Sequence, residues 1–146
     1  MNHGNDMTEI EKIQANAELV INMGKDLGAD LKFDKESVKW IDDFIERHRK
    51  AIDQGLTKKF ISVFGSFVGE CIRHEFGGEW KEVNGGWGVS VGSSSVVFPG
   101  YKISNQFAQG HEGGETIYGL VDLIPTLIER NNSRDTHQDH TNNSAE

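Results

Sequence analysis

The sequence has a single cysteine and no long apolar run, and both shortages limit what the chain can be. Cys71 alone cannot form a disulfide within the chain, which fits a reducing compartment. No apolar stretch approaches the roughly 18–20 residues that a membrane-spanning helix needs. The first residues, MNHGNDMTE, lack the basic start and apolar block of a secretory signal. We therefore expect a soluble, cytoplasmic protein that does not associate with membranes.

Basic residues are also scarce, since 15 Lys and Arg face 23 Asp and Glu and give a net charge of −8. Proteins that bind nucleic acid need a basic stripe to displace counterions, so we expect no nucleic-acid partner. The acidic excess lies at the two ends of the sequence. The length of 146 residues allows one core, and we predict a single α+β domain over 1–130. Residues 131–146 have no apolar side chain beyond one alanine, which predicts a disordered polar tail.

The stretch from Leu56 to Pro99 organises the chain. It begins with a very apolar helix that ends at Gly77, and a helix of this kind must be covered on most sides. Three strand-like runs follow, over 79–83, 87–91 and 95–99. The Asn-Gly between the first two favours a tight turn, so we predict a three-stranded antiparallel meander. Its register stays open, because Trp80 and Val83 would lie on opposite faces of a regular strand.

Helices are predicted on both sides of this unit. Thr8 with Glu11 forms the pattern of a capping box, and the first helix then runs to Gly28. Asp34 is expected to cap a second helix that reaches about Asp53. Opposite charges four residues apart on its outer side indicate a solvated surface, and His48 is expected in the core. Shorter helices are predicted over 101–107 and 116–130. The fold class is therefore α+β, with helices packed around a central apolar helix and a meander, followed by C-terminal helices.

Catalytic patterns are weak. Glu70 and His74 are four apart on the central helix and, with Arg73, form the one acid and base candidate, although a salt-bridged rim explains them as well. Cys71 is expected to be a small buried hydrophobe, since its spacing from His74 does not orient a nucleophile. Metal sites need ligands held by further hydrogen bonds, which the tail residues His137 and His140 lack. His111 near Glu112 and Glu115 is no better placed, so we predict no metal and no cofactor.

Surface features point to binding. Acidic side chains gather on the outer face of the first helix and around the start of the last one. We predict that they meet a protein partner with a basic surface through Glu11, Glu18, Asp26, Glu112, Glu115 and Asp122. Solvation alone is the competing explanation. Two further features have packing as their simpler explanation: an aromatic platform formed by Trp80, Trp87, Phe98 and Tyr101, and the smooth strip at Gly65 and Gly69.

The runs GSFVGECIRHEFGGEW, GWGV and VVFPGYKISNQFAQG resemble a family of small bacterial domains of unknown function. In that family an apolar helix ends in Gly-Gly-x-Trp and leads into a short meander and a Phe-Pro. The resemblance covers roughly 34–128 and implies a fold without catalytic residues to carry over. In size and charge the chain is also similar to the immunity proteins encoded beside bacterial antagonistic toxins.

These observations favour a non-enzymatic binding protein, and we expect an immunity protein that covers the active or substrate-binding surface of a cognate toxin, such as a nuclease. The alternatives are a small enzyme that uses Glu70, Arg73 and His74, or a structural module that assembles through the Gly65 and Gly69 strip or through exposed aromatic side chains. The sequence leaves the oligomeric state open.

Overall fold

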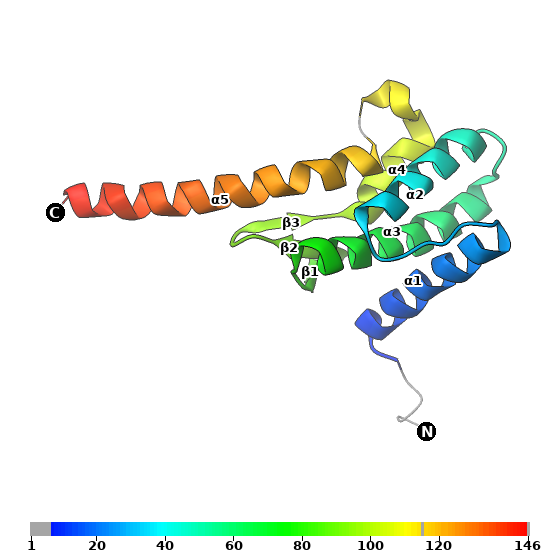
Figure 1. Ribbon diagram of the computed structural model, residues 1–146, viewed down its shortest axis with the longest axis horizontal. Helices are drawn as coiled ribbons and strands as arrows, with labels where there is room; N and C mark the ends of the chain where they lie inside the picture. Colours follow the sequence, from blue (N-terminus) through cyan, green and yellow to red (C-terminus); the bar gives the residue numbers. More distant parts are fainter. Residues whose placement is uncertain (1–6, 115, 146) are drawn as a thin grey trace.

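The computed structural model describes residues 7–114 and 116–145, and its elements follow one another as Figure 1 shows. The helices are α1 (Glu9–Asp26), α2 (Lys35–His48), α3 (Gln54–Phe76), α4 (Pro99–Gln109) and α5 (Ile117–Ala145). The strands are β1 (Trp80–Val83), β2 (Gly86–Val91) and β3 (Ser95–Val97), and a short 3-10 helix, η2, covers His111–Gly113. The predicted α+β class is confirmed, with the meander between the third and fourth helices.

The helix starts follow from local hydrogen bonds. At α1 the Glu11 N–H donates to Thr8 Oγ1 at 3.1 Å and the Thr8 N–H donates to Glu11 Oε1 at 3.3 Å, which is the predicted capping box. Asp34 caps α2 as expected. The central helix begins earlier than Leu56, because the carboxylate of Asp53 accepts the Leu56 N–H at 2.8 Å and so starts α3 at Gln54.

The helix α3 lies at the centre of the fold. Its residues from Phe64 to Ile72 are all buried, and α1, α2, α4, α5 and β2 all contact it. Two of its glycines allow close approach. A side chain on Gly69 would overlap the ring of Trp80, and a Cβ on Gly65 would come within 3.1 Å of the Gly100 Cα. The glycine strip therefore serves packing, between α3 and the sheet at one glycine and between α3 and α4 at the other.

The sheet is an antiparallel meander in the order β1, β2, β3, as predicted. Trp80 pairs with Val89, which pairs in turn with Val97, and the residues from Trp80 to Val83 pair in sequence without a bulge. Trp80 and Val83 therefore lie on opposite faces, and the buried Trp80 faces α3. Asn84 and Gly85 join β1 to β2 with positive φ angles of 52° and 84°, the conformation that a tight two-residue hairpin turn requires.

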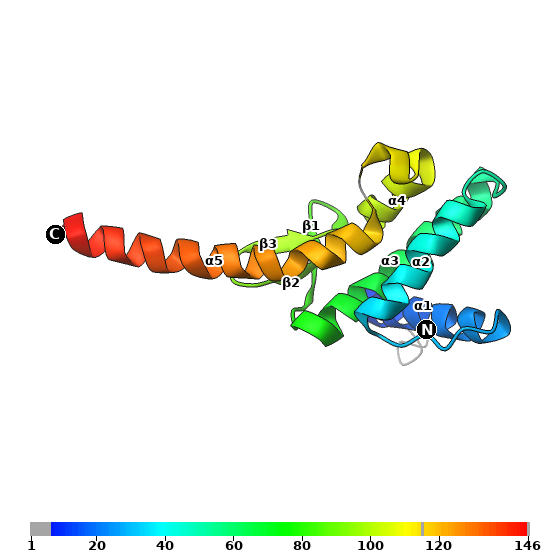
Figure 2. The ribbon, with the colours of Figure 1, turned by 45° about the horizontal axis from the view of Figure 1, so that its top comes forward.

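The last helix is longer than predicted. We expected an end near Arg130, but the helical backbone of α5 passes Pro125 and continues to Ala145. Its packing reaches Asn131, which is 5% exposed and whose Nδ2 donates to Ser95 Oγ at 3.1 Å. In Figures 1 and 2 the part of α5 that follows extends away from the other elements. The predicted disorder of 131–146 in solution stays a prediction, since an isolated polar helix of this length is marginal in water.

Among the residues that the structure describes, no helix combines the length and the apolar character needed to cross a membrane.

Candidate functional site

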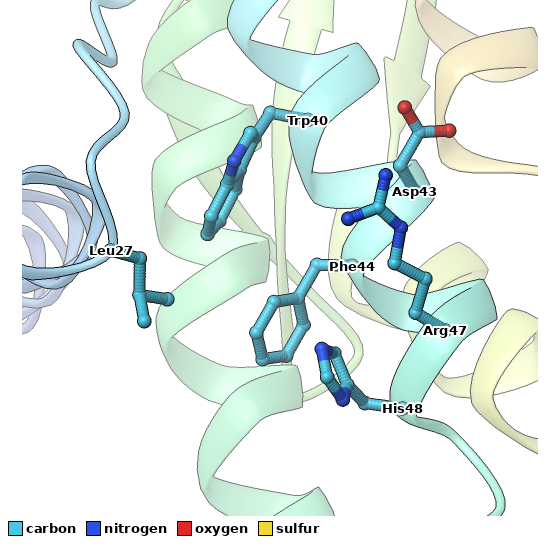
Figure 3. A pocket seen from close by; sticks show the side chains of 6 residues that line it. All are labelled: Leu27, Trp40, Asp43, Phe44, Arg47 and His48. Carbon is cyan, nitrogen blue, oxygen red and sulfur yellow. The ribbon is translucent and has the colours of Figure 1, made fainter.

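An open cavity of about 400 Å³ lies between the C-terminal end of α1 and the outer side of α2. Figure 3 shows it from close by, with Leu27 facing the rings of Trp40 and Phe44. We call it the aromatic pocket, and it is lined by Leu27, Trp40, Asp43, Phe44, Arg47 and His48. Leu27 is the C-cap of α1 and the other residues belong to α2, so the pocket combines the end of one helix with the side of the next.

The aromatic wall of this pocket is anchored in the core. The Trp40 and Phe44 rings stack with their centroids 5.5 Å apart. Phe44 then meets Phe64, which is fully buried, edge to face at 5.4 Å and Phe60 at 5.3 Å. Such ring pairs add roughly 0.5–1.5 kcal/mol each beyond the area they bury. The wall therefore presents half-buried aromatic surface on a rigid support.

His48 lies at the edge of the pocket, which differs from our prediction. We expected it in the core from its place on the apolar side of the helix. The structure leaves it exposed, with its ring 4.5 Å from that of Phe44. His48 is the last residue of α2 and borders the open pocket, so no other element covers it there.

The predicted partner-binding residues fall into two groups. Glu11, Glu18 and Asp26 are exposed on α1, although Glu11 is engaged in the capping box. Glu112 lies in η2, and Asp122 in α5 pairs with Lys35 at 2.6 Å.

Figures 1 and 2 place α1 and η2 on opposite sides of α2 and α3, so the structure does not bring the two groups together. Glu115 lies outside the described residues.

The acid and base candidates on α3 have different partners. Glu70 is 5% exposed, and its Oε2 accepts hydrogen bonds from Arg73 Nη1 at 2.7 Å and from Trp80 Nε1 at 2.8 Å. His74 is exposed, and its ring lies tilted against that of Phe33 with the centroids 5.0 Å apart. The carboxylate thus holds the sheet and a neighbouring arginine, as the salt-bridge explanation predicted.

Cys71 is fully buried, as expected. Burial raises the pKa of its thiol far above the ordinary value, so the group stays protonated and is a poor nucleophile.

A second polar cluster, which our sequence analysis did not predict, joins α2 to the start of α5. Asp42 is 4% exposed, and its carboxylate accepts from Gln106 Nε2 at 3.0 Å and from the Tyr118 N–H at 3.0 Å. The Ile117 N–H donates to Gln106 Oε1 at 2.8 Å. The first turn of α5 therefore finds its acceptors on α2 and α4, and a buried carboxylate sits at its positive end.

His111 completes this cluster. Its Nε2 lies 2.5 Å from Asp42 Oδ1 and its Nδ1 lies 3.8 Å from Glu46 Oε1. The hydrogen bond to Asp42 raises the pKa of His111, and the charge of Glu46 acts in the same direction. Both ring nitrogens face carboxylates of α2, so the imidazole is placed to hold η2 on that helix.

Among the residues with described side chains, no three His, Cys, Asp or Glu converge to hold a metal ion. Comparisons with protein-family models, with curated proteins and with solved structures found no match to this chain. The family resemblance drawn from the sequence therefore stays a prediction, and any functional proposal rests on the chemistry of the sites themselves.

Proposed function

We propose that this chain is a non-enzymatic binding protein and that the aromatic pocket is the centre of its interface. The observation that supports this most directly is the exposure of Leu27, 57%, beside the half-buried rings of Trp40 and Phe44. Tryptophan and arginine are the residue types most enriched where protein interfaces concentrate their binding energy. Here Trp40 forms the wall and Arg47 the edge of one pocket.

The charges near the pocket suit a basic partner. Asp26 directly precedes Leu27 and is exposed, and Asp43 lies on the edge formed by α2. A partner segment that inserts an apolar side chain would bring its flanking Lys or Arg residues against these carboxylates. The net charge of −8 would also speed its approach, because long-range attraction raises association rates.

Within this class the specific proposal is a cytoplasmic bacterial immunity protein that neutralises a cognate toxin. If the toxin is a nuclease, carboxylates would take the place of the phosphates that its basic surface binds. The enclosure of Glu70 by Arg73 and Trp80 is why we favour binding over the enzyme alternative.

The test is capture of partners from a bacterial lysate by the tagged full chain at low and high salt. Leu27→Asp would place a charge against the apolar wall, and Trp40→Ala would remove half of that wall. Leu123→Asp is the matched control, since Leu123 is 45% exposed and lies on α5. We expect one stoichiometric partner that the control retains, that both pocket variants lose and that high salt weakens.

Equal capture by Leu27→Asp, Trp40→Ala and wild type would refute the pocket as the interface. Circular dichroism of each variant checks that the fold is kept.

A further inference from the structure

A second cavity, of about 370 Å³, lies where α1, α3, α4 and the sheet meet. Ligand sites of soluble proteins typically enclose about 300–1,000 Å³, combine apolar and aromatic walls with a few polar groups, and form where several elements join. This cavity is lined by residues of α1 and α3, by Trp80 and Trp87 of the sheet and by Gly100 of α4. It shares no residue with the aromatic pocket, so a ligand here is independent of the proposed partner interface.

Two indoles form its sheet side. Trp80 pairs with Val89 and Trp87 pairs with Glu82, so the alternation along the strands puts both tryptophans on one face of the sheet. Trp80 is held in place by its hydrogen bond to Glu70 and by its ring lying over Gly69. Trp87 is only half-buried, which leaves part of its ring open to the cavity.

Small residues form the floor. Gly65 and Gly100 approach each other closely, since a Cβ on Gly65 would lie 3.1 Å from the Gly100 Cα, and as lining residues without side chains they take up little of the cavity. Ser66 is 6% exposed and its Oγ donates to the Ser62 carbonyl at 2.9 Å. A hydroxyl whose hydrogen is already donated in this way still has lone pairs that can accept a hydrogen bond from a ligand.

The polar groups of the cavity are neutral or neutralise each other. Glu9 and Lys12 pair at 3.1 Å at its edge. Asn16 and Ser62 carry groups that both donate and accept, which is the hydrogen-bonding character of a hydroxylated ligand. The electron-rich face of an indole attracts the slightly positive C–H groups of a saturated ring. We propose that this cavity binds an uncharged, hydroxyl-bearing ring, the chemistry of a neutral sugar.

The test uses NMR of the ¹⁵N-labelled full chain titrated with methyl glucoside, methyl mannoside, N-acetylglucosamine and maltose. The indole N–H signals of the three tryptophans report separately on the two cavities, once Trp→Phe variants assign them. We expect a saturable shift of the Trp87 signal with at least one of these sugars. The Trp40 signal, which belongs to the aromatic pocket, should stay in place.

Gly100→Leu is the blocking variant. Gly100 lines the cavity, and a Cβ built on it meets no atom within 4 Å, so a larger side chain can begin there without a clash, and we expect its remaining atoms to take up cavity space. Gly55→Leu is the matched control, because Gly55 likewise follows the first residue of a helix and lies outside the cavity. The sugar shift should disappear in Gly100→Leu and persist in Gly55→Leu.

Three results would overturn the proposal. One is that no sugar of the set moves the Trp87 signal. Another is that Gly100→Leu binds as well as Gly55→Leu while its remaining signals match a folded spectrum. The third is that indole, used as a flat aromatic probe, shifts Trp87 while all four sugars fail, which would make the ligand aromatic instead. Since none of these results involves Leu27 or Trp40, they leave the proposed partner interface untouched.

Discussion

At the start of η2 a single imidazole faces two carboxylates. His111 touches Asp42 through one ring nitrogen and approaches Glu46 with the other, and the nearby Asp43 adds a further negative charge. The cationic Arg49 lies close by, but its guanidinium donates to the carbonyls of 107 and 108. The hydrogen bond to Asp42 and the charges of the nearby carboxylates raise the pKa of His111 above its ordinary value near 6.5.

This raised pKa gives a pH dependence of stability with a definite sign. The folded state holds the proton more tightly than the unfolded chain, so the contribution is full below about pH 6.5 and is lost as pH rises through the folded pKa. His111→Gln should therefore lower the free energy of unfolding at about pH 5.5, by less than about 1 kcal/mol because the ring is half-exposed. At about pH 9 the difference from wild type should be smaller.

Urea denaturation across this pH range measures the effect. Glu112→Gln, an exposed neighbour outside the cluster, is the control and should not reproduce the pattern. An equal loss at both pH values would mean that His111 contributes packing and no charge.

At the scale of the elements, the contact between α3 and the sheet depends on the absence of one side chain. Gly69→Ala would raise helix propensity by about 1 kcal/mol, yet its Cβ would overlap the ring of Trp80. Trp80 cannot easily give way, because its Nε1–H donates to the buried Glu70. We expect a net loss of about 1–3 kcal/mol of stability, as for other overpacked cores.

The matched control is Gly55→Ala in the same helix, where the nearest atom to an added Cβ is Asp53 Oδ1 at 3.4 Å, an ordinary contact. Guanidinium denaturation compares the free energies of unfolding of the two variants with that of the wild type. If Gly69→Ala were as stable as Gly55→Ala, the close approach of Trp80 to the helix would be wrong.

The elements also show what the sequence could predict. Thr8 and Asp34 cap helices through N–H groups three residues away, so their chemistry is visible in a short window. The strand register and the aromatic pocket depend on residues that meet only after folding. Leu27 and Trp40 belong to different helices, and Asp42 and His111 are 69 residues apart in the sequence. Opposite charges on α2 indicated a solvated face, but Glu46 turns toward Gln106 and His111.

For the whole molecule, the acidic residues should not act as one surface. Glu18 and Asp26 lie on α1, whose C-cap Leu27 lines the aromatic pocket. Glu112 lies in η2, on the opposite side of α2 and α3. Reversing Glu18 and Asp26 to Lys should weaken partner binding more than Glu112→Lys does, and added salt should shrink the difference. Biolayer interferometry with the captured partner measures both. A larger effect of Glu112→Lys would move the interface to η2.

Residues 132–145, the outer part of α5, are predicted to be dispensable for the stability of the fold. Packing reaches Asn131 at β3, and residues 132–146 contain no apolar residue except one alanine. An isolated polar helix of this length is marginal in water. Deleting 132–146 should therefore change the free energy of unfolding by no more than about 0.5 kcal/mol. Amide hydrogens of 132–145 in the full chain should exchange rapidly.

Ending the chain at Leu127 is the contrasting truncation, because it also removes Ile128 and Asn131, which lie against the turn at Gly92. That variant should lose about 1–3 kcal/mol. Slow exchange beyond Asn131, or an equal loss in both truncations, would show that the outer helix is part of the folded body.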